Sequence, residues 1–387
     1  MPTTDVSRES PDRPFVSVLM PAFNEGAMLD QSLARVHAAI CALARRYRGE
    51  IIVVDDGSGD DTWRIADRFA ACHRGVSAVR HPVNLGLGQA LRTGFANCAG
   101  DYVVVLDTDL SYAPEHIEKL VETLRATKAH VAVASPFMKG GTLTNVPPLR
   151  AVLSRLANRF LAFLCPHAGV HTLTGMVRAY DGDFLRTLNL RGLGVEINTE
   201  ILYKTLLLRG RIVEVPAELD WTQQHKMAIK RISSFRVIKG IVTYLLAGFI
   251  FRPFMFFVLP GLVLALCALY VTGWTVYNVV QAYPLVPSGG YWDDQFSAAI
   301  TLVFKERPHA FVVGGVAALL SMQLFSLGFL AYQSKRNFEE LFHLASGIRR
   351  RVIESSPVPD HPECCQEEAG SPGAPAEMPA PPMAGRS

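Results

Sequence analysis

The chain has 387 residues, of which 49% are hydrophobic, and its formal net charge is +3. This length exceeds the roughly 100–200 residues of one ordinary domain. So small a net charge does not point to nucleic acid as a partner. The mean hydropathy of +0.20 is high for a soluble enzyme, and the apolar surplus lies in the C-terminal half. We therefore expect a soluble domain followed by a membrane part.

The first 14 residues are polar and include acidic side chains. They lack the apolar core that a secretory signal peptide needs. We expect a flexible N-terminus at 1–14 and a domain after it that stays in the cytosol.

Residues 15–134 alternate between short apolar runs and stretches with a helical pattern. The expected strands are Phe15–Met20, Glu50–Val54, Val76–Arg80, Tyr102–Leu106 and Val131–Ala134, and the expected helices cover 28–47, 88–96 and 114–127, with another capped by Asp60, Asp61 or Thr62. Apolar strands separated by helices indicate a parallel sheet covered on both faces. The expected fold class is therefore α/β.

Polar side chains follow three of these strands. Asn24 and Glu25 follow the first strand, Asp55 and Asp56 end the second, and Asp107-Thr108-Asp109 ends the fourth. In open parallel sheets, ligands bind beyond the carboxyl ends of the strands. We expect the three segments to meet on one rim and to form a binding site there.

The C-terminal half carries the membrane signals. Residues 231–252 mix basic and apolar side chains, which favours a helix lying on a membrane surface. Phe254–Val280 and Ala310–Gln333 contain no charged residue and exceed the ~20 residues that a span requires. We expect a two-helix anchor at 253–334.

Charge bias sets the expected orientation. Residues 226–252 carry six Lys and Arg and residues 335–351 carry five, whereas the loop 281–309 has only Lys305 and Arg307. By the positive-inside rule, both termini and the domain at 15–230 face the cytosol, which in a bacterium means the inner side of the plasma membrane. We expect an amphipathic cytosolic helix at 335–353 and a disordered, proline-rich tail at 354–387.

The order of the motifs resembles the family 2 glycosyltransferases. The matching segments are Pro21-Ala22-Phe23-Asn24-Glu25, Val54-Asp55-Asp56-Gly57-Ser58, Asn84-Leu85-Gly86 and Asp107-Thr108-Asp109. Lys139-Gly140-Gly141, the run from Thr174 to Tyr180 and Glu214-Val215-Pro216 resemble the polyprenyl-phosphate branch, which includes dolichyl-phosphate mannosyltransferase and undecaprenyl-phosphate glucosyltransferases. The resemblance implies a GT-A-type, mostly parallel sheet with helices on both faces.

Asp107 and Asp109 are the expected metal ligands. Two carboxylates at a strand end can turn toward one Mg²⁺ or Mn²⁺, which bridges them to a diphosphate. The alternative is a solvated acidic turn. In relatives a Gln often assists the metal two residues beyond the second Asp, and here that position is Ser111.

The resemblance also implies a donor site around the first two strands. One of Asp55 and Asp56 contacts the nucleobase in the family, and we favour Asp56. Pro21, Phe23 and Glu25 resemble residues that line the base and ribose, with Asp107 toward the diphosphate. The alternative for the acids is a helix-capping turn.

Arg150, Ser154 and Arg178 are the acceptor candidates. Arg binds phosphate through two parallel hydrogen bonds, and Arg150 and Ser154 share a helix face because they are four residues apart. Lys139, Arg155 and Lys226 are secondary candidates. Relatives usually have Arg where Pro136 stands, so the phosphate contacts here differ in part.

These residues predict inverting transfer of a hexose from a GDP-mannose-class or UDP-glucose-class donor to a polyprenyl phosphate. A second hypothesis has another lipid or a polysaccharide as acceptor, with Glu196 or Glu200 as general base. A third is a non-catalytic membrane scaffold. The resemblance is also compatible with a homo-oligomer.

Overall fold

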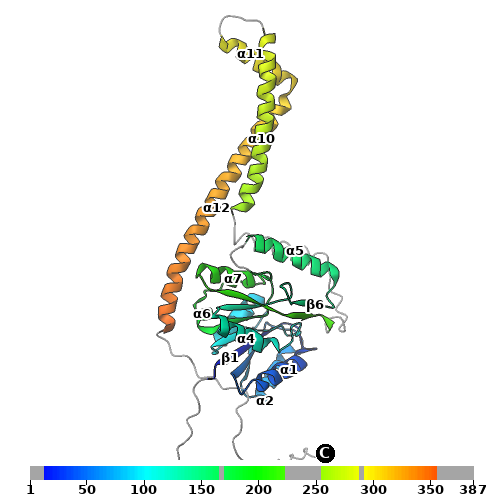
Figure 1. Ribbon diagram of the computed structural model, residues 1–387, viewed down its shortest axis with the longest axis vertical. Helices are drawn as coiled ribbons and strands as arrows, with labels where there is room; N and C mark the ends of the chain where they lie inside the picture. The colour runs from blue at the N-terminus through cyan, green and yellow to red at the C-terminus, as the bar shows by residue number, and fades with distance from the viewer. Residues whose placement is uncertain (1–12, 165–169, 223–253, 287–291, 355–387) are drawn as a thin grey trace, which may run out of the picture.

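The computed structural model describes residues 13–164, 170–222, 254–286 and 292–354. Figure 1 shows an α/β domain from which a column of long helices rises. The expected surface helix at 231–252, Lys226 and the tail beyond Glu354 lie outside the described residues.

A seven-stranded sheet in the order β3-β2-β1-β4-β7-β5-β8 forms the centre of the domain. The strands are β1 (Phe15–Ala22), β2 (Arg48–Asp55), β3 (Val76–Arg80), β4 (Tyr102–Val105), β5 (Val131–Ser135), β7 (Arg178–Asp181) and β8 (Ile212–Pro216). All neighbouring pairs are parallel except those of β7, which is antiparallel to β4 and β5. β6 (Thr142–Thr144) and β9 (Glu218–Asp220) form a separate parallel pair.

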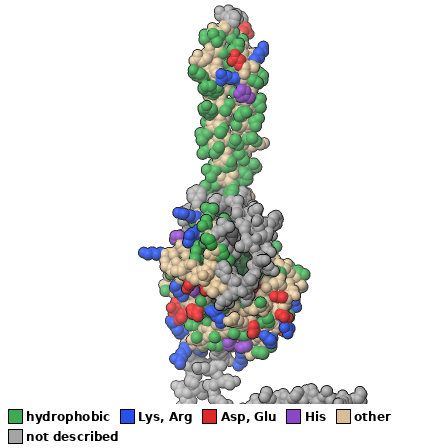
Figure 2. Space-filling model, turned by 90° about the vertical axis from the view of Figure 1, so that its right-hand side faces the viewer, with side chains coloured by type: hydrophobic (Ala, Val, Ile, Leu, Met, Phe, Trp, Pro, Cys, Tyr) green, Lys and Arg blue, Asp and Glu red, His purple; other side chains and the backbone are tan. Residues whose placement is uncertain are grey.

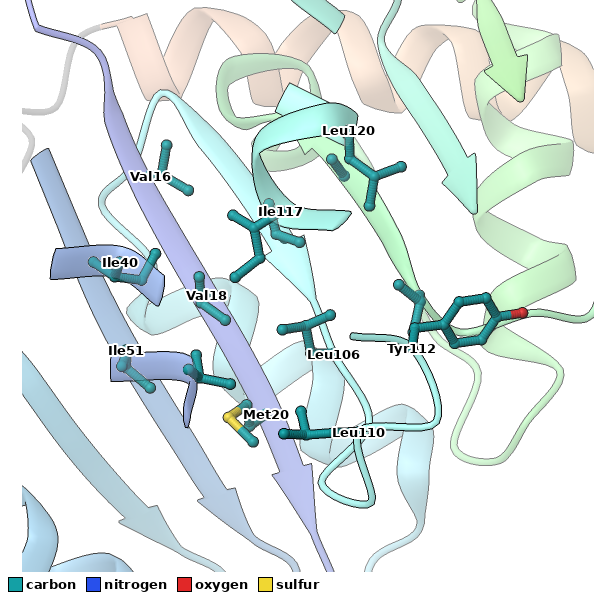
Figure 3. Packing of buried hydrophobic residues seen from close by; sticks show 14 of the residues in the cluster. Val16, Val18, Met20, Ile40, Ile51, Leu106, Leu110, Tyr112, Ile117 and Leu120 are labelled. Atoms are coloured by element: carbon teal, nitrogen blue, oxygen red, sulfur yellow. The ribbon is translucent and has the colours of Figure 1, made fainter. Parts of the chain in front are cut away.

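Helices cover both faces of this sheet, because successive strand residues point to opposite sides. Val18 and Met20 of β1 face one core, shown in Figure 3, and Leu19 faces the other. The helices are α1 (Leu29–Ala42), α2 (Thr62–Cys72), α3 (Leu87–Asn97), α4 (His116–Thr127), α5 (Pro148–Leu164), α6 (Gly182–Thr187) and α7 (Ile197–Leu207). Side chains of α1, α2 and α4 join the first core, and those of α3, α6 and α7 join the second. The predicted fold class is confirmed.

The five predicted strands are all present, but two details differ from the prediction. The first helix ends at Ala42 instead of 47, because the chain turns at Leu43 and then buries Tyr47. Strands β6, β7, β8 and β9 were not expected, because residues 135–230 lack a regular apolar pattern.

Two helices are long and apolar enough to cross a membrane: α10 (Met255–Ala282) and α12 (Pro308–Glu354). They lie side by side, and their side chains form the mostly hydrophobic column in Figure 2. A short turn, η2 (Tyr283–Leu285), and α11 (Trp292–Glu306) lie at the far end. The helix expected at 335–353 is the uninterrupted continuation of α12, which runs beside the α/β domain.

Candidate active site

The expected rim forms at the carboxyl ends of β2, β1 and β4. β1 lies between the other two and is parallel to both, so the three chain exits are neighbours. Asp55 pairs with Ala22 in the β1–β2 register, and the ladder continues past β4 through the bond from Leu106 N to Leu19 O, 3.0 Å. Glu25 and Asp107 are close enough for their charges to interact. The three polar segments therefore converge as the sequence predicts.

The turn after β4 holds its two acids in a defined arrangement. Leu110 adopts a left-handed φ of 47°, a conformation that costs a non-glycine residue about 1–2 kcal/mol. Burial of its side chain beside Met20 offsets this cost (Figure 3). Asp109 Oδ1 then accepts hydrogen bonds from the Ser111 backbone N at 2.9 Å and its hydroxyl at 2.7 Å. Ser111 thus orients Asp109, and its role as a metal ligand stays a prediction.

Negative charge is concentrated at this turn. Burial, with smaller contributions from the negative charges of Asp109 and Glu25, raises the pKa of Asp107 to about 7. Among the described residues, the Asp107 carboxylate makes no hydrogen bond or ion pair with a protein group. Such a carboxylate is stabilised by a cation.

The two carboxylates fit a divalent metal that also binds substrate phosphates better than they fit a metal held by protein ligands alone. No group of three or more His, Cys, Asp or Glu side chains is placed to hold a metal within the described ranges. Mg²⁺ commonly binds one or two carboxylates and takes its other ligands from water and substrate phosphates. Asp107 and Asp109 match that pattern.

The Asp56 carboxylate binds residues of the loop that follows β3. Its Oδ1 lies 2.7 Å from His81 Nδ1 and accepts from Leu85 N at 2.9 Å, and its Oδ2 accepts from Gly86 N at 2.8 Å. The residue is only 3% exposed. The preference for Asp56 as the nucleobase contact is therefore not supported, because both carboxylate oxygens already hold protein groups.

Asp55 is equally enclosed. Its Oδ1 accepts from Ser58 N at 3.1 Å, and its Oδ2 lies 3.1 Å from Arg80 Nε. Arg80 itself is nearly half exposed and stacks on the Trp63 ring at 5.6 Å. Asp55 therefore holds the turn at the end of β2 and binds the Nε of the Arg80 guanidinium.

Sequence reasoning missed His81. Its Nδ1 contacts Asp56 and its Nε2 lies 2.9 Å from Thr93 Oγ1 on α3, so it connects the rim to that helix. The available signal was its position: His81 directly follows β3, as the other rim residues follow their strands.

We predict that Asp56→Ala destabilises the protein by about 2–4 kcal/mol, because three donors lose a buried charged acceptor. The shift in denaturation midpoint of the purified protein measures this. Asp61→Ala is the matched control, since its carboxylate is 66% exposed and pairs with exposed Arg64. A destabilisation no larger than that of the control would contradict the role assigned to Asp56.

The remaining donor candidates differ in exposure. Pro21 is buried within β1 and pairs with Val54, whereas Phe23 is 44% exposed at the rim. The backbone N of Glu25 donates to Thr62 Oγ1 at 2.8 Å, which fixes the loop after β1. Phe23 and Glu25 are accessible to a ligand, whereas Pro21 is part of the buried sheet below the rim.

Arg178 is fully buried on β7. Its two terminal nitrogens donate to Leu173 O at 2.7 Å and Asn198 O at 2.6 Å, and desolvation lowers its pKa. Nearby Tyr112 has its pKa raised by burial and by Asp107 and lowered by the Arg178 charge. The geometry does not fit the predicted direct contact of Arg178 with an acceptor phosphate. It fits a residue that holds the segment before β7 against α7.

The basic helix α5 lies on the side of the domain nearest the membrane-length helices (Figure 1). Ser154 is half-buried, and the Arg150 side chain lies outside the described residues. Arg155 and Arg159 are exposed together with Val152 and Leu156. Asn158 holds the helix in place, since its Oδ1 accepts from Leu173 N at 2.8 Å.

Glu196 and Glu200 both hold the loop that precedes α7. Glu200 accepts from Arg191 N at 3.0 Å and Gly192 N at 2.7 Å and pairs with Lys204 at 2.5 Å. Glu196 accepts from Leu193 N at 3.1 Å and Gly194 N at 2.7 Å. A general base needs a lone pair directed at its substrate. These carboxylates are instead occupied by the protein.

Several known proteins resemble this chain. Residues 17–188 match the family described as Glycosyl transferase family 2. A dolichol-phosphate mannosyltransferase from Pyrococcus furiosus is 30% identical over 229 residues, which cover 58% of this chain and 62% of that protein. A polyprenol monophosphomannose synthase from Mycolicibacterium smegmatis is 32% identical over 206 residues, which cover 51% of this chain and 75% of that protein.

A crystal structure of glucosyl-3-phosphoglycerate synthase from Mycobacterium tuberculosis, in complex with Mn²⁺, UDP and glucosyl-3-phosphoglycerate, is also similar. It is 23% identical, covers 61% of this chain and 80% of that chain, and has a TM-score of 0.46. The sequence relatives carry the assignment, because the similarity to the Mycolicibacterium smegmatis protein extends over three quarters of its length. The chain therefore belongs to glycosyl transferase family 2, as the order of its motifs predicts.

Proposed function

We propose that the protein transfers a hexose from a nucleotide-diphosphate sugar to a polyprenyl phosphate at the cytosolic face of a membrane. The observation that carries this proposal is the carboxylate pair Asp107 and Asp109 at the end of a central parallel strand. The domain that bears the pair continues into two helices long enough to span a bilayer. Two relatives named for mannose and for a dolichol or polyprenol phosphate support the same substrate classes.

The chemistry is a single displacement. An oxygen of the acceptor phosphate attacks the anomeric carbon, the bond from that carbon to the diphosphate breaks, and the nucleoside diphosphate leaves. No proton has to be removed, because a phosphate monoester with a second pKa of about 6 is already anionic near pH 7. One in-line displacement inverts the anomeric configuration. An α-linked donor therefore gives a β-linked lipid-phosphate sugar.

The residues of the chain position the two reactants. Asp107 and Asp109 are the proposed ligands of Mg²⁺ or Mn²⁺, which when bound neutralises charge on the departing diphosphate. Ser111 keeps the Asp109 carboxylate in orientation. Arg150 and Ser154 on α5, with Arg155 nearby, are proposed to hold the acceptor phosphate.

A hydroxyl acceptor is less consistent with this site. It would need a general base, and both Glu196 and Glu200 are engaged by backbone N–H groups. The phosphate acceptor needs none. This occupancy favours the lipid phosphate over a diacylglycerol, a ceramide or a polysaccharide.

Incubation of the purified full chain with radiolabelled GDP-mannose or UDP-glucose, polyprenyl phosphate and Mn²⁺ tests the proposal. We expect label in the organic extract with one of these donors and with polyprenyl phosphate. The same lipid as a free polyprenol should remain unlabelled. No lipid label with either donor would overturn the proposal.

Asp109→Ala distinguishes an enzyme from a scaffold. We expect a loss of transfer of at least about 100-fold, the range seen when one electrostatic contact to a developing charge is removed. Transfer at the wild-type rate would instead place the activity outside this rim. Asp61→Ala is the control, because its carboxylate is exposed at the residue that precedes α2.

A further inference from the structure

The part of α12 that extends beyond the apolar span lies against the catalytic domain through one face. Phe342 and Ser346 on that face are each only 6% exposed, whereas the neighbouring Leu341 and Leu344 are 66% and 67% exposed. Glu339 precedes Phe342 by three residues and so lies on the same side of the helix. Glu339, Phe342 and Ser346 therefore mark the face of α12 that docks on the domain, and this docking contact is the α12 seat.

This seat is on α7. The Tyr203 hydroxyl donates to Glu339 Oε1 at 3.1 Å, and Lys335 Nζ lies 5.6 Å from the centre of the Tyr203 ring. Lys204 Nζ lies 5.3 Å from the centre of the Phe342 ring. A cation close to an aromatic face gains about 0.5–2 kcal/mol, most where water is excluded. Here the Lys204 side chain is 6% exposed.

Lys204 connects the seat to the loop before α7. Its ammonium pairs with Glu200, whose carboxylate holds Arg191 N and Gly192 N. A buried ion pair depends on exclusion of water and on complete hydrogen bonding. Phe342 supplies part of that exclusion, because its ring covers the ammonium.

The same loop supports the N-terminus of α3. Gly88 N donates to Leu193 O at 2.7 Å, and a Cβ at Gly86 would lie 2.4 Å from that oxygen. The chain just before α3 is bound to Asp56 through Leu85 N and Gly86 N, and Gly57 touches Val83 and Asn84 so closely that a Cβ would not fit. Direct contacts thus run from α12 to the donor side of the rim.

We propose that the cytosolic part of α12 is a docked arm that fixes the donor-binding loops, with Phe342, Lys204 and Glu200 as positioning residues. For the identity of the ligand this inference rests on the proposed function. The arm sets the local stability of residues 85–97 and 189–196. Without it those segments open more often, and a nucleotide diphosphate has to bind loops that are less ordered.

Hydrogen exchange of the full chain in nanodiscs tests the arm directly. In Phe342→Ala we expect amides of 85–97 and 189–196 to exchange about tenfold faster, with β1 and β4 unchanged. Leu344→Ala is the matched control, because it removes an exposed side chain from the same helix and should exchange like the wild type. Wild-type exchange in Phe342→Ala would overturn the proposal.

Tyr203→Phe is a milder second variant in case Phe342→Ala does not fold, since it removes only the hydrogen bond to Glu339. It should accelerate exchange of the same two segments by a smaller factor. An effect spread evenly over the domain would contradict the proposal.

Ligand binding gives the readout that a purely structural contact would not move. We expect Phe342→Ala to raise the dissociation constant of GDP or UDP, measured with Mn²⁺, about three- to tenfold. In transfer assays the KM for the nucleotide-sugar should rise by a similar factor while the KM for the lipid stays unchanged. If the wild-type protein transfers no sugar, the proposed function is wrong. The exchange experiment still tests the contact of α12 with the domain independently.

Discussion

Asp107→Asn should abolish sugar transfer and at the same time stabilise the metal-free protein at alkaline pH. The loss of activity, at least about 1,000-fold, follows from removal of one of two proposed ligands facing the donor diphosphate. The gain in stability follows from the charge cluster. The folded state raises the pKa of Asp107 to about 7 through burial and the neighbouring carboxylates Asp109 and Glu25.

The sign of the pH dependence is fixed by this shift. A carboxyl whose pKa is higher in the folded than in the unfolded state binds its proton more tightly when folded, so stability falls as pH rises from about 4 to 7. Above pH 7 the cost is complete. We expect a cost of about 1–3 kcal/mol, because Asp107 retains some contact with solvent, which screens these charges.

Unfolding curves in a metal chelator at pH 5 and pH 8 measure this effect. The wild type should lose stability between the two pH values, and Asp107→Asn should lose less. Asp183→Asn is the control, since its carboxylate is 97% exposed. If Asp107→Asn is less stable than the wild type at pH 8, the charge cluster does not carry the cost assigned to it.

Arg178→Ala should destabilise the protein by about 3–5 kcal/mol. The substitution leaves a cavity and removes the donors of two buried carbonyl oxygens, those of Leu173 and Asn198. Denaturant unfolding of the purified protein measures the loss.

The same residue separates two interpretations of the acceptor site. A guanidinium that touched the lipid phosphate would lower affinity for the lipid with little effect on stability. A buried guanidinium that holds backbone segments lowers stability first. Arg155→Ala is the matched control, because this exposed arginine on α5 should cost within about 0.5 kcal/mol. Equal stability of the two variants would return Arg178 to the list of direct ligands.

The sequence predicts the strands well, because each is a short, mostly apolar segment. The convergence of Glu25 with Asp107 and Asp109 follows from parallel strand geometry alone. The roles of the individual acids do not. Asp55 and Asp56 are adjacent and both buried, and only the fold reveals that His81, Leu85 and Gly86 approach Asp56 from a different loop.

Arg178 shows the same limit from the other direction. An arginine near a family-like motif suggests a phosphate ligand, but sequence carries no signal for burial when the strand is four residues long. Its carbonyl partners lie 5 and 20 residues away, and neither has a side chain that would betray the contact. Similarly, Glu196 and Glu200 resemble bases until the backbone of residues 191–194 is seen to occupy them.

Because α12 is one continuous helix, it sets the distance between the proposed membrane span and the α/β domain. Its 47 residues correspond to about 70 Å at 1.5 Å per residue, of which a bilayer core takes about 30 Å. Glu339, where the contact with the domain begins, lies only six residues beyond the charge-free stretch that ends at Gln333, about 9 Å along the helix. A bilayer that is a few Å thicker or thinner, or a change in helix tilt, therefore alters the height and angle of the rim above the lipid surface. Under the proposed function, membrane thickness would therefore affect how closely the acceptor lipid phosphate approaches the bound sugar.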